Sequence, residues 1–193
     1  MGIVFSVTAL LVASVACGLS VAVALRVKKL LDPLTEEGVL NRRRGAAPEV
    51  GTVVPRAPFM VNMDGNEVAF PAPGSDPWVL SFQSVGCSGC KQQLPTYKKF
   101  LSSTGLGEER VFSLVIGEAD GVAFYRDELS GFANVIPVDG QDSTLALMAE
   151  LGVSVFPTYL IVDGNGRVKV SSQSSAGLTQ TSSGYLAPIS VGS

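Results

Sequence analysis

The chain has 193 residues, with 14 Lys and Arg against 17 Asp and Glu, three cysteines and no histidine. The lack of histidine excludes a Ser–His–Asp triad, a Cys–His protease pair and any metal site built on imidazole, and three cysteines are one short of an all-cysteine zinc site. The net charge of −3 excludes a general attraction to nucleic acid. We therefore predict no metal, no cofactor and no nucleic-acid partner.

The first predicted element is a transmembrane helix. The 23 residues from Ile3 to Leu25 carry no charge and are dominated by Val, Ala, Leu and Ile. At about 1.5 Å per residue, such a helix crosses a hydrocarbon core of about 30 Å. A cleaved signal peptide is the rival interpretation, but such peptides start with a basic region, and no basic side chain precedes Ile3. We predict a single-pass anchor at residues 1–25, in contact with the membrane through residues 3–25, with Cys17 inside it.

A basic stem is predicted to follow at residues 26–50. Between Arg26 and Arg44, six basic residues face three acidic ones, whereas the chain from Gly45 onward is acidic. The basic residues thus follow the C-terminal end of the predicted helix. By the positive-inside rule, the chain beyond the helix would lie in the cytoplasm. Alternatively, these basic residues serve to contact anionic lipid headgroups.

Beyond the stem, strand-like and helix-like segments alternate. The predicted elements, in chain order, are a hairpin at 59–61 and 68–70 around Asp64-Gly65, a strand at 78–82, a helix at 88–101, a strand at 111–116, a helix at 122–132, a strand at 135–136, a helix at 143–151 and a hairpin at 158–162 and 167–170. This order predicts an α/β domain at residues 51–171, with a mixed central sheet covered by helices on both faces. Residues 172–193 are rich in Ser, Gly and Thr, so we predict a flexible tail there.

The pair Cys87-Ser88-Gly89-Cys90 lies between the buried strand and the helix that follows it. At a helix start this spacing lets the two sulfurs meet across one turn, and the free N–H groups and the helix dipole stabilise a thiolate on Cys87. That is the geometry of reversible disulfide chemistry. Half of a zinc site is the alternative, but the sequence has no second cysteine pair and no histidine to complete one.

A second signal lies downstream, at Phe156-Pro157-Thr158. Pro157 directly precedes the first strand of the last hairpin, where a cis peptide bond leaves the preceding backbone free to pair with an incoming extended chain. A proline at the start of a strand is ordinary by itself, and its combination with the cysteine pair is what makes it informative. We predict that Phe156 and Pro157 bind substrate.

Together these motifs resemble the thioredoxin fold. The resemblance rests on the segment from Trp78 to Pro95 with its cysteine pair, on Phe156-Pro157-Thr158 and on the hairpin at 163–166, and it covers about residues 51–170. With a hairpin in front of the first buried strand and an N-terminal anchor, the chain is similar to the membrane-tethered TlpA, ResA and MauD branch of bacterial thiol-disulfide oxidoreductases.

The resemblance implies roles for individual residues. Cys87 would attack a substrate disulfide, Cys90 would resolve the mixed disulfide, and Pro157 would be a cis-proline against the active site. Two positions depart from the family: Ser81 stands where thioredoxins commonly have a buried acid, and Gln93 stands where the ResA-like branch often has Glu. Both departures remove a titratable group that could deprotonate the resolving thiol.

The function that this implies is a membrane-anchored thiol-disulfide oxidoreductase, which exchanges disulfides with protein thiols and receives electrons from a donor that the sequence does not identify. A MauD-like factor for disulfide-dependent assembly of a partner protein is the alternative. A thiol peroxidase is a weaker one, because Leu80 occupies the usual proline position and no Arg lies near Cys87 in the sequence. The sequence gives no reason to assign oligomerisation.

The resemblance and the charge pattern disagree about location. The family works outside the cytoplasmic membrane, where disulfides persist, whereas the positive-inside rule points to the cytoplasm. Because the resemblance covers the functional domain, we expect that domain on the extracytoplasmic side.

Overall fold

The computed structural model describes residues 47–56, 60–70, 76–138, 143–182 and 184–186. The predicted anchor at 1–25 and most of the stem at 26–50 therefore lie outside the described residues. Within the described ranges, no helix combines the length and the apolar character that a bilayer span requires.

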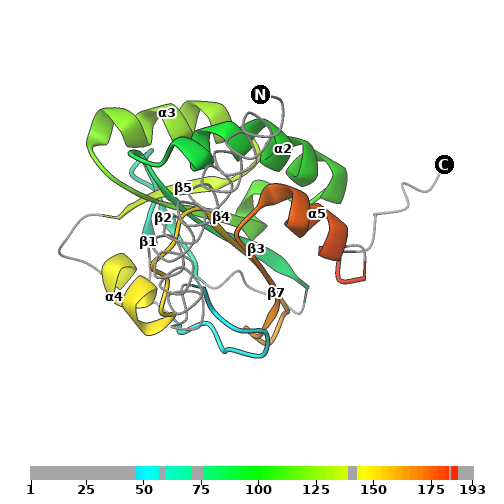
Figure 1. The fold of residues 1–193 in the computed structure, drawn as a ribbon. Coiled ribbons are helices and arrows are strands. Elements are labelled where there is room, and N and C mark those ends of the chain that lie inside the picture. The colour runs from blue at the N-terminus through cyan, green and yellow to red at the C-terminus, as the bar shows by residue number, and fades with distance from the viewer. Residues whose placement is uncertain (1–46, 57–59, 71–75, 139–142, 183, 187–193) are drawn as a thin grey trace, which may run out of the picture. The chain divides into compact units, whose positions relative to one another are not determined.

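The domain is built on a five-stranded mixed sheet (Figure 1). Its strands are β3 (Trp78–Ser84), β4 (Val111–Ile116), β5 (Asn134–Val138), β6 (Thr158–Val162) and β7 (Val168–Ser172). They lie in the order β5-β4-β3-β6-β7, with β3, β4 and β5 parallel to one another, β6 antiparallel to β3, and β7 antiparallel to β6. Strand β3 is central and buried from Trp78 to Gln83, as a nearly continuous apolar run between two helix layers should be.

Helices cover both faces of the sheet, as predicted (Figure 1). They are α2 (Ser88–Thr104), α3 (Ala119–Leu129), α4 (Ser143–Glu150) and α5 (Ser175–Ser182), and a 3-10 turn, η1 (Glu108–Arg110), precedes β4. Successive residues of a strand point to opposite faces. Val79 therefore joins the apolar core under α2, α3 and α5, whereas Leu80 joins the core under α4.

The predicted N-terminal hairpin is present, with its second strand one residue earlier than predicted. Strands β1 (Met60–Val61) and β2 (Glu67–Val68) pair antiparallel. Between them, the side-chain oxygen of Asn62 accepts hydrogen bonds from the backbone N–H groups of Asp64, at 3.1 Å, and Asn66, at 2.9 Å. The side chain of Asn62, which can imitate a backbone turn, thus organises a five-residue connection around Asp64-Gly65.

The prediction of a flexible tail from residue 172 is wrong for its first part. Ser175–Ser182 form α5, whose Leu178 is fully buried against the sheet. The Gln93 side-chain oxygen of α2 accepts a hydrogen bond of 2.7 Å from the Ser175 backbone N–H, so a neighbouring helix caps the amino end of α5. The composition of the tail predicts no such structure, because the helix depends on contacts made far away in the chain.

The loop between β3 and α2 is fixed by close packing around Val85. The Val85 backbone N–H donates to the carbonyl of Ile116, at 3.0 Å. A Cβ atom built on Gly117 would lie 2.5 Å from the Val85 side chain, and one built on Gly121 would lie 2.1 Å from it. Only glycine fits at these two positions, and their lack of a side chain creates the space that holds the loop before Cys87.

Leu178→Ala should lower the free energy of unfolding by about 2–5 kcal/mol, because it removes a fully buried side chain and leaves a cavity. The matched control is Gln180→Ala on the exposed face of the same helix, which should change stability by less than about 0.5 kcal/mol. Urea denaturation followed by circular dichroism measures both variants. Equal stability of the two would show that α5 does not pack on the domain.

Gly121→Ala should destabilise the protein by about 1–3 kcal/mol, because the added methyl group overlaps Val85. The control is Gly184→Ala, since a Cβ atom at Gly184 meets nothing within 4 Å. In a double-mutant cycle, Val85→Ala should relieve the overlap, so that the loss in the double variant is smaller than the sum of the two single losses. Additive losses in thermal unfolding would disprove the proposed packing.

Candidate functional site

The site starts at Cys87, which is the N-cap residue of α2. The backbone at Cys87 is extended (φ −87°, ψ 107°), and its sulfur accepts a hydrogen bond of 3.1 Å from the backbone N–H of Cys90. The first turn of α2 contains no acidic side chain. The free N–H groups at the helix start therefore have the Cys87 sulfur as their capping atom, and the helix dipole favours negative charge at this position.

Cys87 is also tied to the loop before β6. The Phe156–Pro157 peptide bond is cis, and the Cys87 thiol donates to the carbonyl oxygen of Phe156 over 3.4 Å. The Thr158 hydroxyl donates to the carbonyl of Val155, at 2.7 Å, which closes the loop on itself. The structure thus brings Cys87, Phe156 and Pro157 together, although 69 residues separate Cys87 from Phe156.

The two cysteines differ in burial. Both thiols are free, and Cys87 is partly exposed, whereas Cys90 is fully buried beneath it. Burial raises the pKa of the Cys90 thiol to about 12, and the hydrogen bond and charge of Cys87 add to the shift. Such a pair has one thiol that a partner molecule can reach and one that reacts only with its neighbour, provided that something removes its proton.

Two elements that contribute to the site carry an exposed apolar side chain. Phe124 of α3 is 42% exposed, and Val155, in the loop before β6, is 37% exposed. The ammonium group of Lys91 lies 5.7 Å from the centre of the Phe124 ring, within the range of a cation–π contact. Both side chains are accessible to an apolar part of another molecule.

The two positions that depart from the family have other partners in the structure. The Ser81 hydroxyl on β3 lies 2.7 Å from the Ser113 hydroxyl on β4, and both residues are fully buried. Gln93, through its side-chain oxygen, caps α5 as described above. Neither residue brings a titratable group to Cys90.

Sequence reasoning missed three residues around the cysteine pair. Tyr125 of α3 donates a hydrogen bond of 3.4 Å to the carbonyl of Ser84, which also accepts from the N–H of Cys87 at 3.1 Å. Gln83 and Tyr159 are fully buried on the face of the sheet that carries Cys90. The sequence does contain a sign of Gln83, because a polar amide side chain is unusual near the end of a strand whose other residues are mostly apolar.

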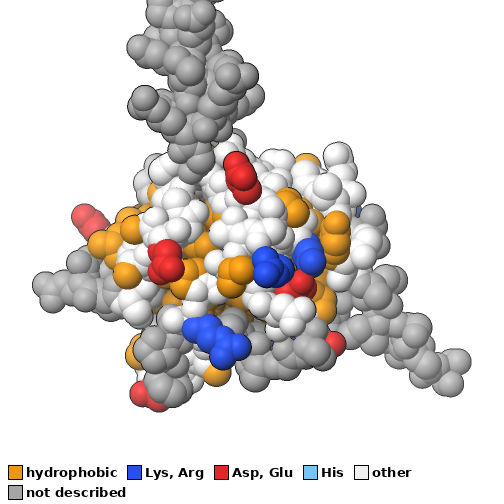
Figure 2. Space-filling model, turned by 90° about the horizontal axis from the view of Figure 1, so that it is seen from below, with side chains coloured by type: hydrophobic (Ala, Val, Ile, Leu, Met, Phe, Trp, Pro, Cys, Tyr) orange, Lys and Arg blue, Asp and Glu red, His pale blue; other side chains and the backbone are white. Residues whose placement is uncertain are grey.

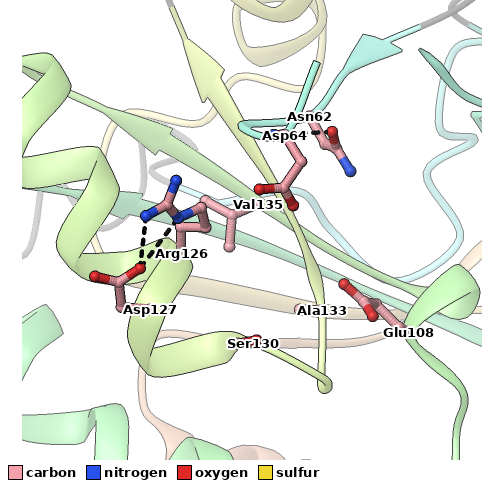
Figure 3. Close-up of a pocket in the computed structure, with 8 residues that line it drawn as sticks. All are labelled: Asn62, Asp64, Glu108, Arg126, Asp127, Ser130, Ala133 and Val135. Carbon is pink, nitrogen blue, oxygen red and sulfur yellow. Dashed lines mark hydrogen bonds and ion pairs between the residues drawn. The ribbon is translucent and has the colours of Figure 1, made fainter. Parts of the chain in front are cut away.

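A small polar pocket of about 90 Å³ is formed elsewhere on the domain (Figure 3). Asp64, Glu108 and the Arg126–Asp127 ion pair, with a nearest N–O distance of 2.8 Å, line it. Glu108 lies in the turn just before β4, and Ala133 directly precedes β5, so the pocket is at the amino ends of these strands. The cysteine pair follows the carboxyl end of β3, where ligands of parallel sheets usually bind. We assign no function to the pocket.

No other part of the described surface presents a comparable group of reactive side chains. On the face seen in Figure 2, acidic and basic side chains occur singly or in small mixed groups among hydrophobic and other side chains. In the described ranges, no group of three or more Cys, Asp or Glu residues is placed to hold a metal ion. The cysteine pair and the Pro157 loop are therefore the candidate site.

The comparisons with known proteins address the fold. No protein-family model matches the sequence, and no curated protein matches it. Among solved structures, the thioredoxin domain of a thiol-disulfide oxidoreductase from Bacteroides vulgatus is similar with a TM-score of 0.58 and 18% identity, over 72% of this chain and 98% of that one. A thiol:disulfide interchange protein from a Bacteroides species gives a TM-score of 0.60 and 16% identity, over 75% and 94%.

A third similar structure is a thiol:disulfide interchange protein of the thioredoxin family from Chlorobium tepidum, with a TM-score of 0.57 and 15% identity, over 72% of this chain and 99% of that one. At such low identity the likeness establishes the fold and not the activity. Together with the sheet order and the helix positions described above, it shows that the chain has the thioredoxin fold.

Proposed function

We propose that this protein is a thiol-disulfide oxidoreductase that exchanges disulfides with protein substrates through Cys87 and Cys90. The observation that carries the proposal is the arrangement of the two sulfurs: an accessible Cys87 sulfur at the N-cap of α2, hydrogen-bonded to the backbone of a buried Cys90. The similar solved structures are themselves named as thiol-disulfide interchange proteins or oxidoreductases, which supports the same chemistry here.

In the reaction, the Cys87 thiolate attacks one sulfur of a substrate disulfide, and the other substrate sulfur leaves as a thiol. The mixed disulfide on Cys87 then faces Cys90, whose thiolate attacks the Cys87 sulfur and releases the second substrate thiol. Two electrons pass from the dithiol to the substrate, and the Cys87–Cys90 disulfide remains. The reverse sequence oxidises a substrate, and the reduction potential of the pair sets the direction.

The Pro157 loop is proposed to bind the substrate chain. The Phe156 carbonyl lies beside the Cys87 sulfur, and Val155, its neighbour in the same loop, is exposed. An extended peptide at this place has backbone groups to pair with and an apolar surface to cover, as in strand-like peptide recognition.

The membrane anchor and the location form a separate part of the proposal. Residues 3–25 form an uncharged apolar segment long enough to span a bilayer. We propose that this segment tethers the domain to the outer side of the cytoplasmic membrane, as in the TlpA, ResA and MauD branch that the sequence resembles. Disulfide exchange has substrates in such an oxidising compartment.

Cys90→Ala should accumulate mixed disulfides through Cys87, because the resolving thiol is absent. Non-reducing electrophoresis of cell extracts, with free thiols blocked before lysis, should show adducts that disappear when dithiothreitol is added. Cys87→Ala, which keeps the buried cysteine and removes the accessible one, is the matched control and should form none. An absence of adducts in the Cys90→Ala protein, at normal expression, would contradict disulfide exchange.

A membrane-impermeant maleimide should label Cys87 in intact cells after treatment with an impermeant phosphine reductant. Labelling should be lost in Cys87→Ser, which leaves Cys17 and Cys90 in place, and this variant identifies the reacting thiol. If Cys87 is protected in intact cells and becomes reactive only after lysis, the domain is cytoplasmic, as the positive-inside rule predicts.

A further inference from the structure

Several buried polar atoms lie in the core behind the cysteine pair without a partner. Both polar atoms of the Gln83 side chain and the hydroxyl groups of Tyr97 and Tyr159 are buried and make no hydrogen bond to another described residue. Buried polar groups in native proteins are nearly always hydrogen-bonded, to protein or to internal water. A cluster of such atoms in one place therefore needs a physical explanation.

All of these side chains lie on one face of the sheet. Ser81 on β3 is paired in register with Tyr159 on β6 and with Ser113 on β4. Gln83 points to the same face as Ser81, because alternate residues of a strand share a face, and it lies about 7 Å further along β3 toward the cysteines. Cys90, Tyr97 and Tyr159 belong to the apolar core that covers this face.

The cluster is close to the resolving thiol. Burial raises the pKa of Tyr159, and the nearby Tyr97, Cys90, Tyr125 and Cys87 add to the shift in that order. The backbone of Ser84, the neighbour of Gln83, lies beside the Cys90 thiol and lowers its pKa, against the larger effect of burial, which raises it. The Gln83 amide on β3 and the Tyr159 side chain on β6 lie on the face of the sheet that Cys90, in the first turn of α2, also covers.

We propose that Gln83 and Tyr159 hold an internal water against the Cys90 thiol and that this water accepts the thiol proton during resolution of the mixed disulfide. The inference rests on the proposed disulfide exchange, since the resolving step exists only in that reaction. It gives Gln83 and Tyr159 the role of positioning residues, and it explains how a site with Ser81 and Gln93 in place of acids can still deprotonate a buried thiol.

The step balances without any further reagent. The proton of Cys90 passes to the water, which returns a proton to base in the solvent. The Cys90 sulfur then forms a bond to the Cys87 sulfur, the bond between Cys87 and the substrate sulfur breaks with its electron pair, and the substrate leaves as a thiolate that takes a proton from solvent. Cys87 and Cys90 are oxidised to a disulfide, and the substrate is reduced.

The groups that surround Cys90 are neutral ones. The titratable side chains that interact with it are Cys87 in the loop, Tyr125 on α3 and Tyr159 on β6, while the buried polar side chains on β3 and β4 are Ser81, Gln83 and Ser113. No carboxylate of the described residues is among the causes of its pKa shift. A water fixed by an amide and a phenol is therefore the polar acceptor that this environment can supply.

The test is a single-turnover measurement on the full-length protein in detergent. Reaction of the reduced protein with a dithiobis-nitrobenzoate reagent places one thionitrobenzoate on Cys87 and releases the other as a coloured thiolate. Attack by Cys90 on the adduct then releases a second coloured thiolate, and the rate of this second release is measured. Gln83→Leu and Tyr159→Phe should each slow this release by about tenfold or more at pH 7. The deficit should vanish toward pH 10, where hydroxide removes the proton directly. Tyr97→Phe is the matched control, because it removes an equally buried hydroxyl on the same face that lies beside Ser81 and Ser113, about two turns along α2 from Cys90.

Each outcome decides a different point. If the adduct of the unmodified protein releases its thiolate no faster than that of Cys90→Ala, the proposed function fails. If the unmodified protein releases it rapidly, and Gln83→Leu and Tyr159→Phe do so at the same rate at pH 7, the water relay fails while the function stands. A deficit that is constant at all pH values, or that Tyr97→Phe shares, would show that these side chains act only through packing, and it would also overturn the relay.

Discussion

The hydrogen bond from the Cys90 backbone N–H to the Cys87 sulfur is the constraint on which the site depends. It makes one atom serve as the cap of α2 and as the accessible thiol of the pair. A Ser or Asp at this position would also cap the helix, but neither could form a disulfide with Cys90, which lies one helical turn further along α2. The start of α2 and the chemistry of the site are thus specified by the same residue.

The rest of the domain holds this constraint in place from three sides. From β3, the Ser84 carbonyl accepts from both the Cys87 N–H and the Tyr125 hydroxyl. Gly117, between β4 and α3, and Gly121, in the first turn of α3, leave space for Val85. From the strand that pairs with β3 on its other side, the loop before β6 brings the Phe156 carbonyl to the sulfur. Small changes at these distant positions act on Cys87 through packing, because a close-packed interior transmits displacement.

The sequence predicted the alternation of strands and helices, the mixed sheet and the residues gathered at the site, since these depend on local patterns and on the spacing of Cys87, Cys90 and Pro157. It did not predict α5, because a helix with one buried leucine and a cap from Gln93 depends on its neighbours and not on its own composition. It also did not predict the pairing of Ser81 with Ser113, which requires the register of two strands. Local sequence patterns therefore predict individual helices and strands better than they predict contacts between residues of different elements.

The hydrogen bond from the Cys87 thiol to the Phe156 carbonyl depends on whether Cys87 is a free thiol or part of a disulfide. In the dithiol form, the Cys87 thiol has a hydrogen to donate, and the Phe156 carbonyl accepts it. Once Cys87 is in a disulfide it has no such hydrogen, so this carbonyl loses its internal donor and is left to accept one from another chain. The two redox forms therefore differ in the number of free backbone acceptors on the loop before β6, and a backbone N–H placed against this carbonyl would find it occupied in one form and open in the other.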